Sequence, residues 1–230
     1  MDLYAGEGEI VGIIGPSGCG KSTLLNILAG FDWGETGLAT YLGKPLGEPS
    51  PERAMVFQSA SLFPWLTVRD NIAYGLKRKK SKHKDIRSLT DQYMKLVGLE
   101  DFADFYPDQL SGGMQQRVAL TRVLILKPKV LLMDEPFASL DAQSRLVMQQ
   151  LLLTLWQEFR PTILFVTHDI DEALFLADRI YILSKRPGTV LREMKVPMDR
   201  PRSLQQVNAS ACAQLKNEIM HLLFTGTLLT

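Results

Sequence analysis

A nine-residue run near the N-terminus constrains this chain more than any other feature. Residues 15–23 read Gly-Pro-Ser-Gly-Cys-Gly-Lys-Ser-Thr, which fits the phosphate-loop pattern G-x-x-x-x-G-K-[ST]. The apolar residues 10–14 predict a buried strand before this loop, and residues 23–29 predict a helix after it. Glycines let a backbone wrap around a phosphate, and the helix start adds amides and its positive dipole end. The pattern therefore predicts a nucleoside triphosphate site.

The side chains of this loop have separate expected tasks. Lys21 can reach the β- and γ-phosphates, and the Ser22 hydroxyl can bind Mg²⁺. Cys19 is expected to be exposed and to take no part in the chemistry. The residues expected to contact the nucleotide here are Gly15, Pro16, Ser17, Gly18, Cys19, Gly20, Lys21, Ser22 and Thr23.

The bulk composition indicates a globular protein rather than a membrane-spanning or disordered one. The chain has 230 residues, of which 46% are hydrophobic and 22% charged, and its formal net charge is +1. That charge gives no reason to expect nucleic acid or an anionic membrane as the main partner. Two cysteines make no disulfide framework, which indicates a reducing compartment. No apolar stretch approaches the ~20 residues that span a bilayer, and the N-terminus has no basic signal region.

Short apolar runs alternate with helical stretches along the chain, which predicts a parallel sheet with helices on both faces. Residues 66–126 show helical spacing and no convincing strand, so we expect an inserted helical subdomain there. The rest of the domain is expected at about 1–65 and 127–202, followed by a helical tail at 203–230. The expected strands are residues 10–14, 54–57, 130–133, 163–166 and 181–183.

Two adjacent carboxylates, Asp134 and Glu135, follow the apolar strand predicted at 130–133. Asp134 is suited to the Mg²⁺ shell, as a Walker B aspartate is. Glu135 can point at the water that attacks the γ-phosphate and act as its general base. The alternative is a helix-capping pair, but two buried carboxylates without a cation are costly, which favours the metal role.

A second candidate phosphate site begins at Leu110-Ser-Gly-Gly-Met-Gln115. Ser111 is a natural N-cap for the helix expected to follow, and Gly112 and Gly113 leave the start of that helix open to a phosphate. One nucleotide does not need two such helix ends from one subunit. We therefore expect this end to serve a nucleotide held by a second copy of the chain.

With these motifs, the chain resembles the nucleotide-binding subunit of ATP-binding cassette (ABC) transporters. The resemblance implies an α/β P-loop NTPase (RecA-like) core with an inserted α-helical subdomain, and a head-to-tail dimer that hydrolyses ATP with Mg²⁺. It identifies Gln58 as the Q-loop glutamine that contacts Mg²⁺ and water, and His168 as the switch histidine that holds the γ-phosphate. It places Asp141 in the D-loop and adds Gln115 of the signature motif to the nucleotide-binding residues. Expected metal ligands are Ser22, Gln58 and Asp134.

A finer resemblance points to the subfamily that imports nitrate, sulfonates and taurine. It is carried by residues 63–68, 165–173 and 184–188. It implies a peripheral subunit at the cytoplasmic face of the bacterial inner membrane, bound to integral membrane permease subunits. A solute-binding protein would deliver the solute to that permease. Phe63 and Trp65 either form the groove for the permease or pack the helical subdomain against the core. The sequence leaves both readings open.

Two alternatives belong to other functional classes. The basic residues 77–84 are the one feature favouring a soluble ABC-type ATPase that acts on nucleic acid, but no aromatic residue is interleaved for base stacking. Family members also usually carry a longer segment before the phosphate loop. We therefore expect an incomplete N-terminal antiparallel β part, with residues 37–44 lacking some strand partners, and an inactive truncated cassette is the second alternative.

Overall fold

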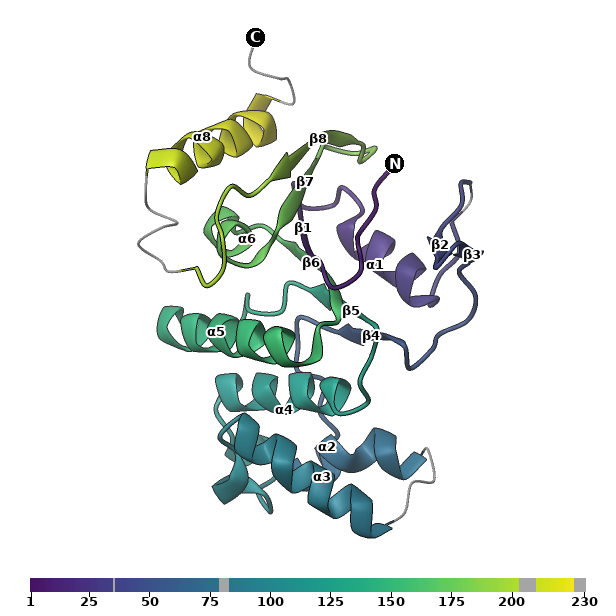
Figure 1. Ribbon diagram of the computed structural model, residues 1–230, viewed down its shortest axis with the longest axis vertical. Helices are drawn as coiled ribbons and strands as arrows, with labels where there is room; N and C mark the ends of the chain where they lie inside the picture. The colour runs from purple at the N-terminus through teal and green to yellow at the C-terminus, as the bar shows by residue number, and fades with distance from the viewer. Residues whose placement is uncertain (35, 79–82, 203–209, 226–230) are drawn as a thin grey trace.

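The computed structural model describes residues 1–34, 36–78, 83–202 and 210–225, and the rest are left out here. A six-stranded sheet lies at its centre (Figure 1). The strand order is β4-β5-β6-β1-β7-β8, in which every neighbouring pair is parallel except β7 and β8. The strands are β1 (Ile10–Ile14), β4 (Arg53–Val56), β5 (Val130–Asp134), β6 (Thr162–Thr167), β7 (Arg179–Leu183) and β8 (Val190–Lys195).

The five strands expected from the sequence are present, and their bounds differ from the expected ones by at most two residues. Every residue of β1, β6 and β7 is buried, as continuous apolar strands are in a sheet covered on both faces. The sequence analysis missed β8. That strand lies at the sheet edge, and three of its six residues are charged, so its apolar signal is weak.

The strand residues alternate between two cores on opposite faces of the sheet. On one face, Val11 and Ile13 pack with Leu25 of helix α1 (Lys21–Ala29). On the other face, Ile10 and Ile14 pack with the buried sides of the remaining helices. These include α5 (Ala142–Phe159), α6 (Ile170–Leu176) and α8 (Ser210–Thr225). The period of two along each strand thus decides which helix each side chain meets.

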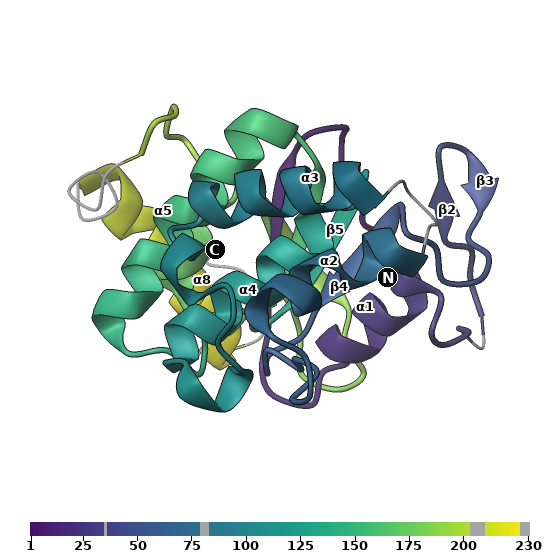
Figure 2. The same ribbon diagram turned by 90° about the horizontal axis from the view of Figure 1, so that it is seen from below.

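Three helices lie together beyond the β4 end of the sheet, and Figure 2 shows them from below. They are α2 (Val68–Arg78), α3 (His83–Leu96) and α4 (Gly112–Leu124), with two short 3-10 turns, η1 (Glu100–Phe102) and η2 (Pro107–Gln109), between α3 and α4. All three fall in the stretch expected to be helical. Ile72, Met94 and Leu124 are almost completely buried between them and join the main core.

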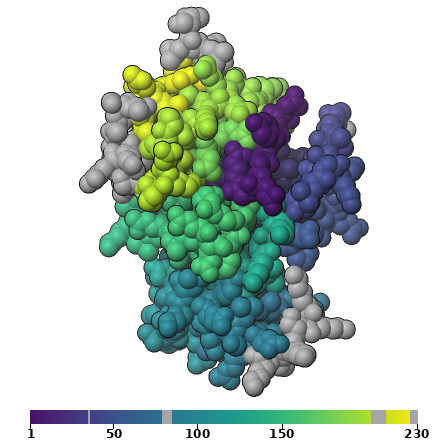
Figure 3. All heavy atoms as spheres, viewed as in Figure 1, coloured from purple at the N-terminus to yellow at the C-terminus, as the bar shows by residue number. Residues whose placement is uncertain are grey.

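The segment after α1 forms a small separate hairpin. Strands β2 (Thr40–Tyr41) and β3 (Lys44–Pro45) pair only with each other, and the hairpin stands off the side of the molecule (Figure 3). The expected strand at 37–44 is therefore realised only as one arm of this hairpin and part of its turn.

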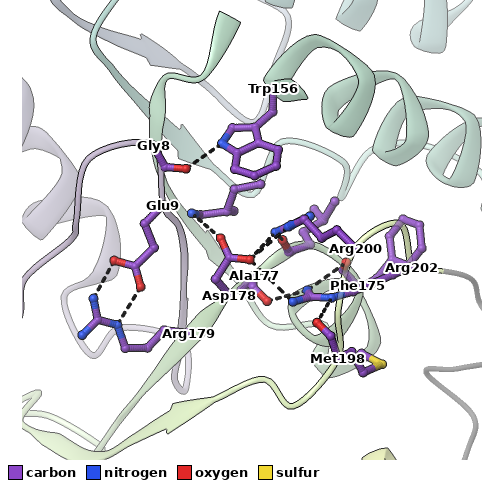
Figure 4. Close-up of polar contacts among 12 residues, drawn as sticks. Gly8, Glu9, Trp156, Phe175, Ala177, Asp178, Arg179, Met198, Arg200 and Arg202 are labelled. Carbon is purple, nitrogen blue, oxygen red and sulfur yellow. Dashed lines mark hydrogen bonds and ion pairs between the residues drawn. The ribbon is translucent and has the colours of Figure 1, made fainter. Parts of the chain in front are cut away.

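The amino ends of β1 and β7 are fastened by partly buried polar and ionic contacts (Figure 4). Asp178 accepts the backbone N–H of Ile10 at 2.9 Å and two hydrogen bonds from Arg200 at 2.8 and 3.0 Å. Arg202 donates to the carbonyl oxygens of Leu174 and Ala177 at the end of α6. A cation at a helix C-terminus is favourable because it meets the negative end of the dipole. These contacts lie at the amino ends of the strands, so the carboxyl ends remain open for a ligand.

The C-terminal helix α8 packs on α6 and β7, and its Ile219 and Leu222 are completely buried. Lys216 pairs with Asp171 of α6 at 2.6 Å. Within the described residues, the helical tail expected at 203–230 is the packed helix α8; residues 203–209 and 226–230 of that tail lie outside them. Among the described residues, no helix is both long and apolar enough to cross a membrane.

Candidate active site

Four neighbouring parallel strands bring the expected site residues to one edge of the sheet. Gln58 lies just after β4, and His168 lies just after β6. Asp134 ends β5 and Glu135 follows it, while the phosphate loop follows β1. Neighbouring strands lie about 4.8 Å apart, so this row spans roughly 15 Å. Ligands of open α/β sheets bind at this carboxyl edge.

The phosphate loop connects β1 to α1. Gly18 and Gly20 have φ of 76° and 104°, a region that favours glycine, and a Cβ on either would point into open space. Gly20 caps α1 without a side-chain hydrogen bond, and the first turn of α1 has no acidic residue. The Nζ of Lys21 is buried under the loop and donates to the carbonyl oxygens of Gly15 at 2.7 Å and Pro16 at 3.0 Å. The loop therefore offers free amides and a positive charge, while Ser17, Ser22 and Thr23 are exposed.

Cys19 is buried, with 5% of its surface exposed, so the expected exposure of this side chain is wrong. Its thiol lies in the apolar cluster that contains Val11, Leu25 and Leu183. The reason is a tertiary contact: the side chain at position 19 packs on the end of the sheet, where Leu183 ends β7. Cys19 thus anchors the phosphate loop to the core.

Glu135 and His168 contact each other at the centre of the row. Their Oε2 and Nδ1 atoms lie 3.1 Å apart, and His168 is mostly exposed. Glu135 has a φ of 43°, rare for a residue with a side chain, and its backbone N–H donates to Val166 of β6 at 3.0 Å. Because backbone outliers of this kind cluster at functional sites, the geometry supports a special role for Glu135.

Asp134 and Ser22 carry the oxygen ligands that suit Mg²⁺. Asp134 is the last residue of β5. One strand, β6, lies between β5 and β1, and the loop after β1 leads to Ser22. Mg²⁺ is commonly bound by one or two protein oxygens together with the phosphates of a nucleotide. The residues present fit that pattern. Gln58 is exposed just beyond β4, at the end of the same row.

The glycine pair that begins α4 does not belong to this row. Ser111 caps α4, its Oγ accepting the N–H of Met114 at 3.3 Å, and the residue is exposed. A Cβ on Gly113 would lie 3.5 Å from Ser144, and one on Gly112 would lie 3.9 Å from Leu140. The structure therefore places the start of α4 against the start of α5, in the segment that carries Asp141.

Gln115 and Asp141 hold local structure in this conformation. The Nε2 of Gln115 donates to the carbonyl oxygens of Pro107 at 2.8 Å and Leu110 at 3.3 Å, which fixes the turn before α4. Asp141 caps α5 by accepting the N–H of Ser144 at 2.9 Å, and this hydrogen bonding lowers the pKa of its carboxyl. Their expected contact with nucleotide stays a prediction.

Sequence reasoning missed a link between the D-loop and the residue after His168. Arg145 donates to Oδ2 of Asp169 at 3.2 Å and to the carbonyl oxygen of Leu140 at 3.2 Å. Asp169 in turn caps α6 by accepting the N–H of Glu172. One arginine thus holds the loops after β5 and β6 together. The only sequence signal was a charged residue four positions after Asp141 in a helix.

Glu172, one turn beyond His168, is a second missed residue. Its side chain is buried on α6, where its Oε2 accepts a long 3.5 Å hydrogen bond from Gln149 and its Oε1 has no hydrogen-bond partner among the described residues. Burial, reinforced by the charge of Asp169, raises the pKa of this carboxyl to about 7. A folded pKa above the unfolded one means that the native state binds the proton more tightly.

We expect the stability contribution of Glu172 to fall as pH rises from about 4.5 to 7, because the unfolded carboxyl loses its proton first. Replacing Glu172 by Gln should remove this dependence. Urea unfolding at pH 5 and pH 8 should show wild type losing up to about 3 kcal/mol relative to the variant between the two pH values. Glu100→Gln, at an exposed carboxylate, is the control and should track wild type. An equal pH dependence of wild type and Glu172→Gln would contradict the buried neutral carboxyl.

Comparison with known proteins agrees with this arrangement. The family model described as "ABC transporter" matches residues 1–138. The chain belongs to the ABC transporter family. The chain is 45% identical over 228 residues to the nitrate import ATP-binding protein NrtD of Synechococcus elongatus, which covers 97% of this chain and 83% of that protein. It is 46% identical over 191 residues to the taurine import ATP-binding protein TauB of Pelagibacter ubique, which covers 83% of this chain and 72% of that protein.

A solved structure supports the fold. The dimeric post-hydrolysis structure of the ATP-binding cassette MJ0796, bound to ADP and Pi, has a TM-score of 0.74 and 35% identity, covering 86% of this chain and 89% of that one. The ABC-type P-loop fold expected from the sequence is thus confirmed, and the chain is an ATPase of this family.

Proposed function

We propose that this ABC ATPase is the energy-supplying subunit of an importer for a small anionic or zwitterionic solute of the nitrate or taurine type. The similarity to NrtD and TauB over most of the chain supports this class of solute. The proposal rests above all on one observation of the structure. Gln58, Asp134, Glu135, His168 and the phosphate loop occupy the carboxyl ends of four adjacent strands.

Each residue of that row has a proposed role in ATP hydrolysis. Lys21 and the loop amides hold the β- and γ-phosphates, and Glu135 takes the proton of the attacking water. His168, placed by its contact with Glu135, holds the γ-phosphate, and Gln58 orders the water. Asp134, Ser22 and Gln58 would hold Mg²⁺, which when bound neutralises charge on the phosphates.

Two copies are proposed to close head to tail around two ATP molecules. The exposed start of α4, with Ser111 and the two glycines after it, would meet the nucleotide on the other copy's phosphate loop. Gln115 and Asp141 would complete that contact. ATP drives closure because it makes contacts that only the closed dimer offers, and hydrolysis removes them. The helical subdomain at about 66–126 would pass this motion to the permease, at the cytoplasmic face of the membrane.

Trp65 is the proposed anchor for the permease. It is 71% exposed, whereas its neighbour Phe63 is half-buried, with its ring 4.5 Å from Tyr74 and below the guanidinium of Arg122. The two aromatic residues therefore divide the roles that the sequence left open. Phe63 packs against Tyr74 and Arg122 of the helical subdomain, and Trp65 presents its ring at the surface beside α2.

Trp65→Ala is expected to weaken permease binding roughly 30-fold, because truncating a central interface tryptophan typically costs 2 kcal/mol or more. The assay is the fraction of the chain recovered with membranes from cells that co-express a nitrate- or taurine-type permease. ATP hydrolysis by the isolated variant should stay at the wild-type rate. Phe224→Ala, an exposed aromatic on α8 at the far end of the molecule, is the control (Figure 1). Undiminished membrane recovery of Trp65→Ala would remove this residue from the interface.

Uptake tests the solute class. Cells that lack the ATPase subunit of a nitrate or a taurine importer should regain ATP-dependent uptake of that solute when this chain is expressed with the matching permease. Lys21→Ala should not restore it. Failure with both permeases, together with ATP-dependent binding of DNA or RNA that weakens with salt, would favour the nucleic-acid alternative instead.

A further inference from the structure

The turn between β7 and β8 packs directly on the phosphate loop. Gly188, in this turn, approaches the backbone of Cys19 so closely that an added Cβ would overlap its carbonyl oxygen and lie 3.3 Å from its carbonyl carbon. The φ of Gly188 is not in the left-handed region, so its backbone conformation alone does not require glycine. The requirement comes from the contact with the loop.

This turn is held rigid by one serine. The Oγ of Ser184 accepts the N–H of Thr189 at 2.9 Å and lies within 3.1 Å of the carbonyl oxygens of Lys185 and Pro187. The N–H of Ser184 donates to the carbonyl oxygen of Thr189 at 2.9 Å, which closes the turn at its base. The Ser184 hydroxyl has one proton and so donates to one of these carbonyl oxygens at a time, while the two hydrogen bonds between Ser184 and Thr189 close the turn beside Gly188.

The phosphate loop is held on its other side by the sheet. The buried side chain of Cys19 packs among apolar residues that include Leu183, the last residue of β7. A Cβ on Gly15, at the start of the loop, would lie 2.9 Å from the Sγ of Cys19 and 3.0 Å from the Cβ of Leu183. Residue 19 is therefore enclosed between the end of β7 and the turn that follows it.

We propose that the turn at residues 184–189 is a brace for the phosphate loop, in which Gly188 and Ser184 act as positioning residues for ATP binding. Neither residue is among those expected to contact the nucleotide. The brace fixes the carbonyl of Cys19, and with it the direction in which the following amides of the loop point. Because the loop binds ATP before and during hydrolysis alike, distorting it should weaken binding in both states and leave the chemical step unchanged. The inference rests on the proposal that this loop is the ATP site.

Gly188→Ala tests the brace, with Gly47→Ala as its matched control. A Cβ on Gly47 meets nothing within 4 Å, and Gly47 also lies outside the left-handed region. We expect Gly188→Ala to raise the KM for ATP, and the Kd measured by calorimetry, about tenfold, with kcat within about twofold of wild type. Gly47→Ala should match wild type in all three. A residue with a merely structural role would instead reduce the folded fraction and lower kcat, with no change in KM.

Ser184→Ala provides a second variant that adds no atoms to the contact. As with Gly188→Ala, loss of these hydrogen bonds should raise the KM for ATP, here about fivefold. If Gly188→Ala fails to fold, this variant decides the question. An unchanged KM in a folded Gly188→Ala would overturn the brace. If Gly188→Ala does not fold, an unchanged KM in Ser184→Ala would overturn it. If wild type itself binds no ATP, or Lys21→Ala binds it as well as wild type does, the ATP site proposed for the loop fails instead.

Discussion

Replacing Glu135 by Gln is expected to lower ATP turnover roughly 10²–10⁴-fold, the usual contribution of a positioned general base. The amide keeps the shape of the carboxylate but cannot accept a proton from water. ATP binding should survive, because the phosphate loop and Lys21 are untouched. In the proposed head-to-tail dimer, uncleaved ATP would continue to bridge the two copies, so the closed dimer should accumulate.

Two measurements on the same samples check this expectation. A phosphate-release assay gives turnover, and light scattering with ATP and Mg²⁺ gives the oligomeric state. The variant should be slow and dimeric, whereas wild type should return to monomer as ATP is consumed. Glu48→Gln, at an exposed carboxylate after the β2–β3 hairpin, should behave as wild type. Turnover of Glu135→Gln at the wild-type rate would remove Glu135 from the role of base.

Lys21→Ala is expected to weaken ATP binding roughly 10- to 150-fold. Hydrogen bonds to charged groups contribute about 1.5–3 kcal/mol, and the Nζ of Lys21 is buried beneath the loop where screening is weak. In this structure its Nζ donates to the carbonyl oxygens of Gly15 and Pro16, so the lysine also closes the loop on itself. The substitution therefore removes both the proposed phosphate ligand and a support of the loop.

Calorimetric titration with ATP in the presence of Mg²⁺ measures this loss. Lys95→Ala, which removes an exposed lysine from the last turn of α3, is the control for net charge and should bind ATP as wild type does. Thermal unfolding without nucleotide checks that both variants are folded. ATP binding by Lys21→Ala at the wild-type affinity would show that the nucleotide lies elsewhere.

Much of the site could be predicted because its residues depend on local sequence. A phosphate loop needs glycines, a lysine and a hydroxyl at fixed spacing between a strand and a helix, and all of these are adjacent in the chain. The same holds for Asp134 and Glu135 at the end of an apolar run. The strands were predictable because their continuous apolar residues are buried on both faces.

The misses share one physical cause, which is contact between residues distant in sequence. Cys19 looked exposed because loops usually are, yet the end of β7 receives its side chain. Glu172 looked like an ordinary helical carboxylate, and only the packing of α5 against α6 buries it. Edge strand β8 pairs antiparallel with β7, and its three charged residues left too weak an apolar signal.

By itself, the sequence determined the chemical groups of this ATPase and the succession along the chain of most of its strands and helices, since both follow from residue type and short spacing. Only the tertiary structure decided which of these groups meet. The strand order β4-β5-β6-β1 puts Gln58, Glu135 and His168 in one row with the phosphate loop. It also sets Gly188 against Cys19, although 169 positions separate them along the chain (188 minus 19). Strand order and side-chain packing are properties of the whole sheet, so no local pattern could reveal these contacts.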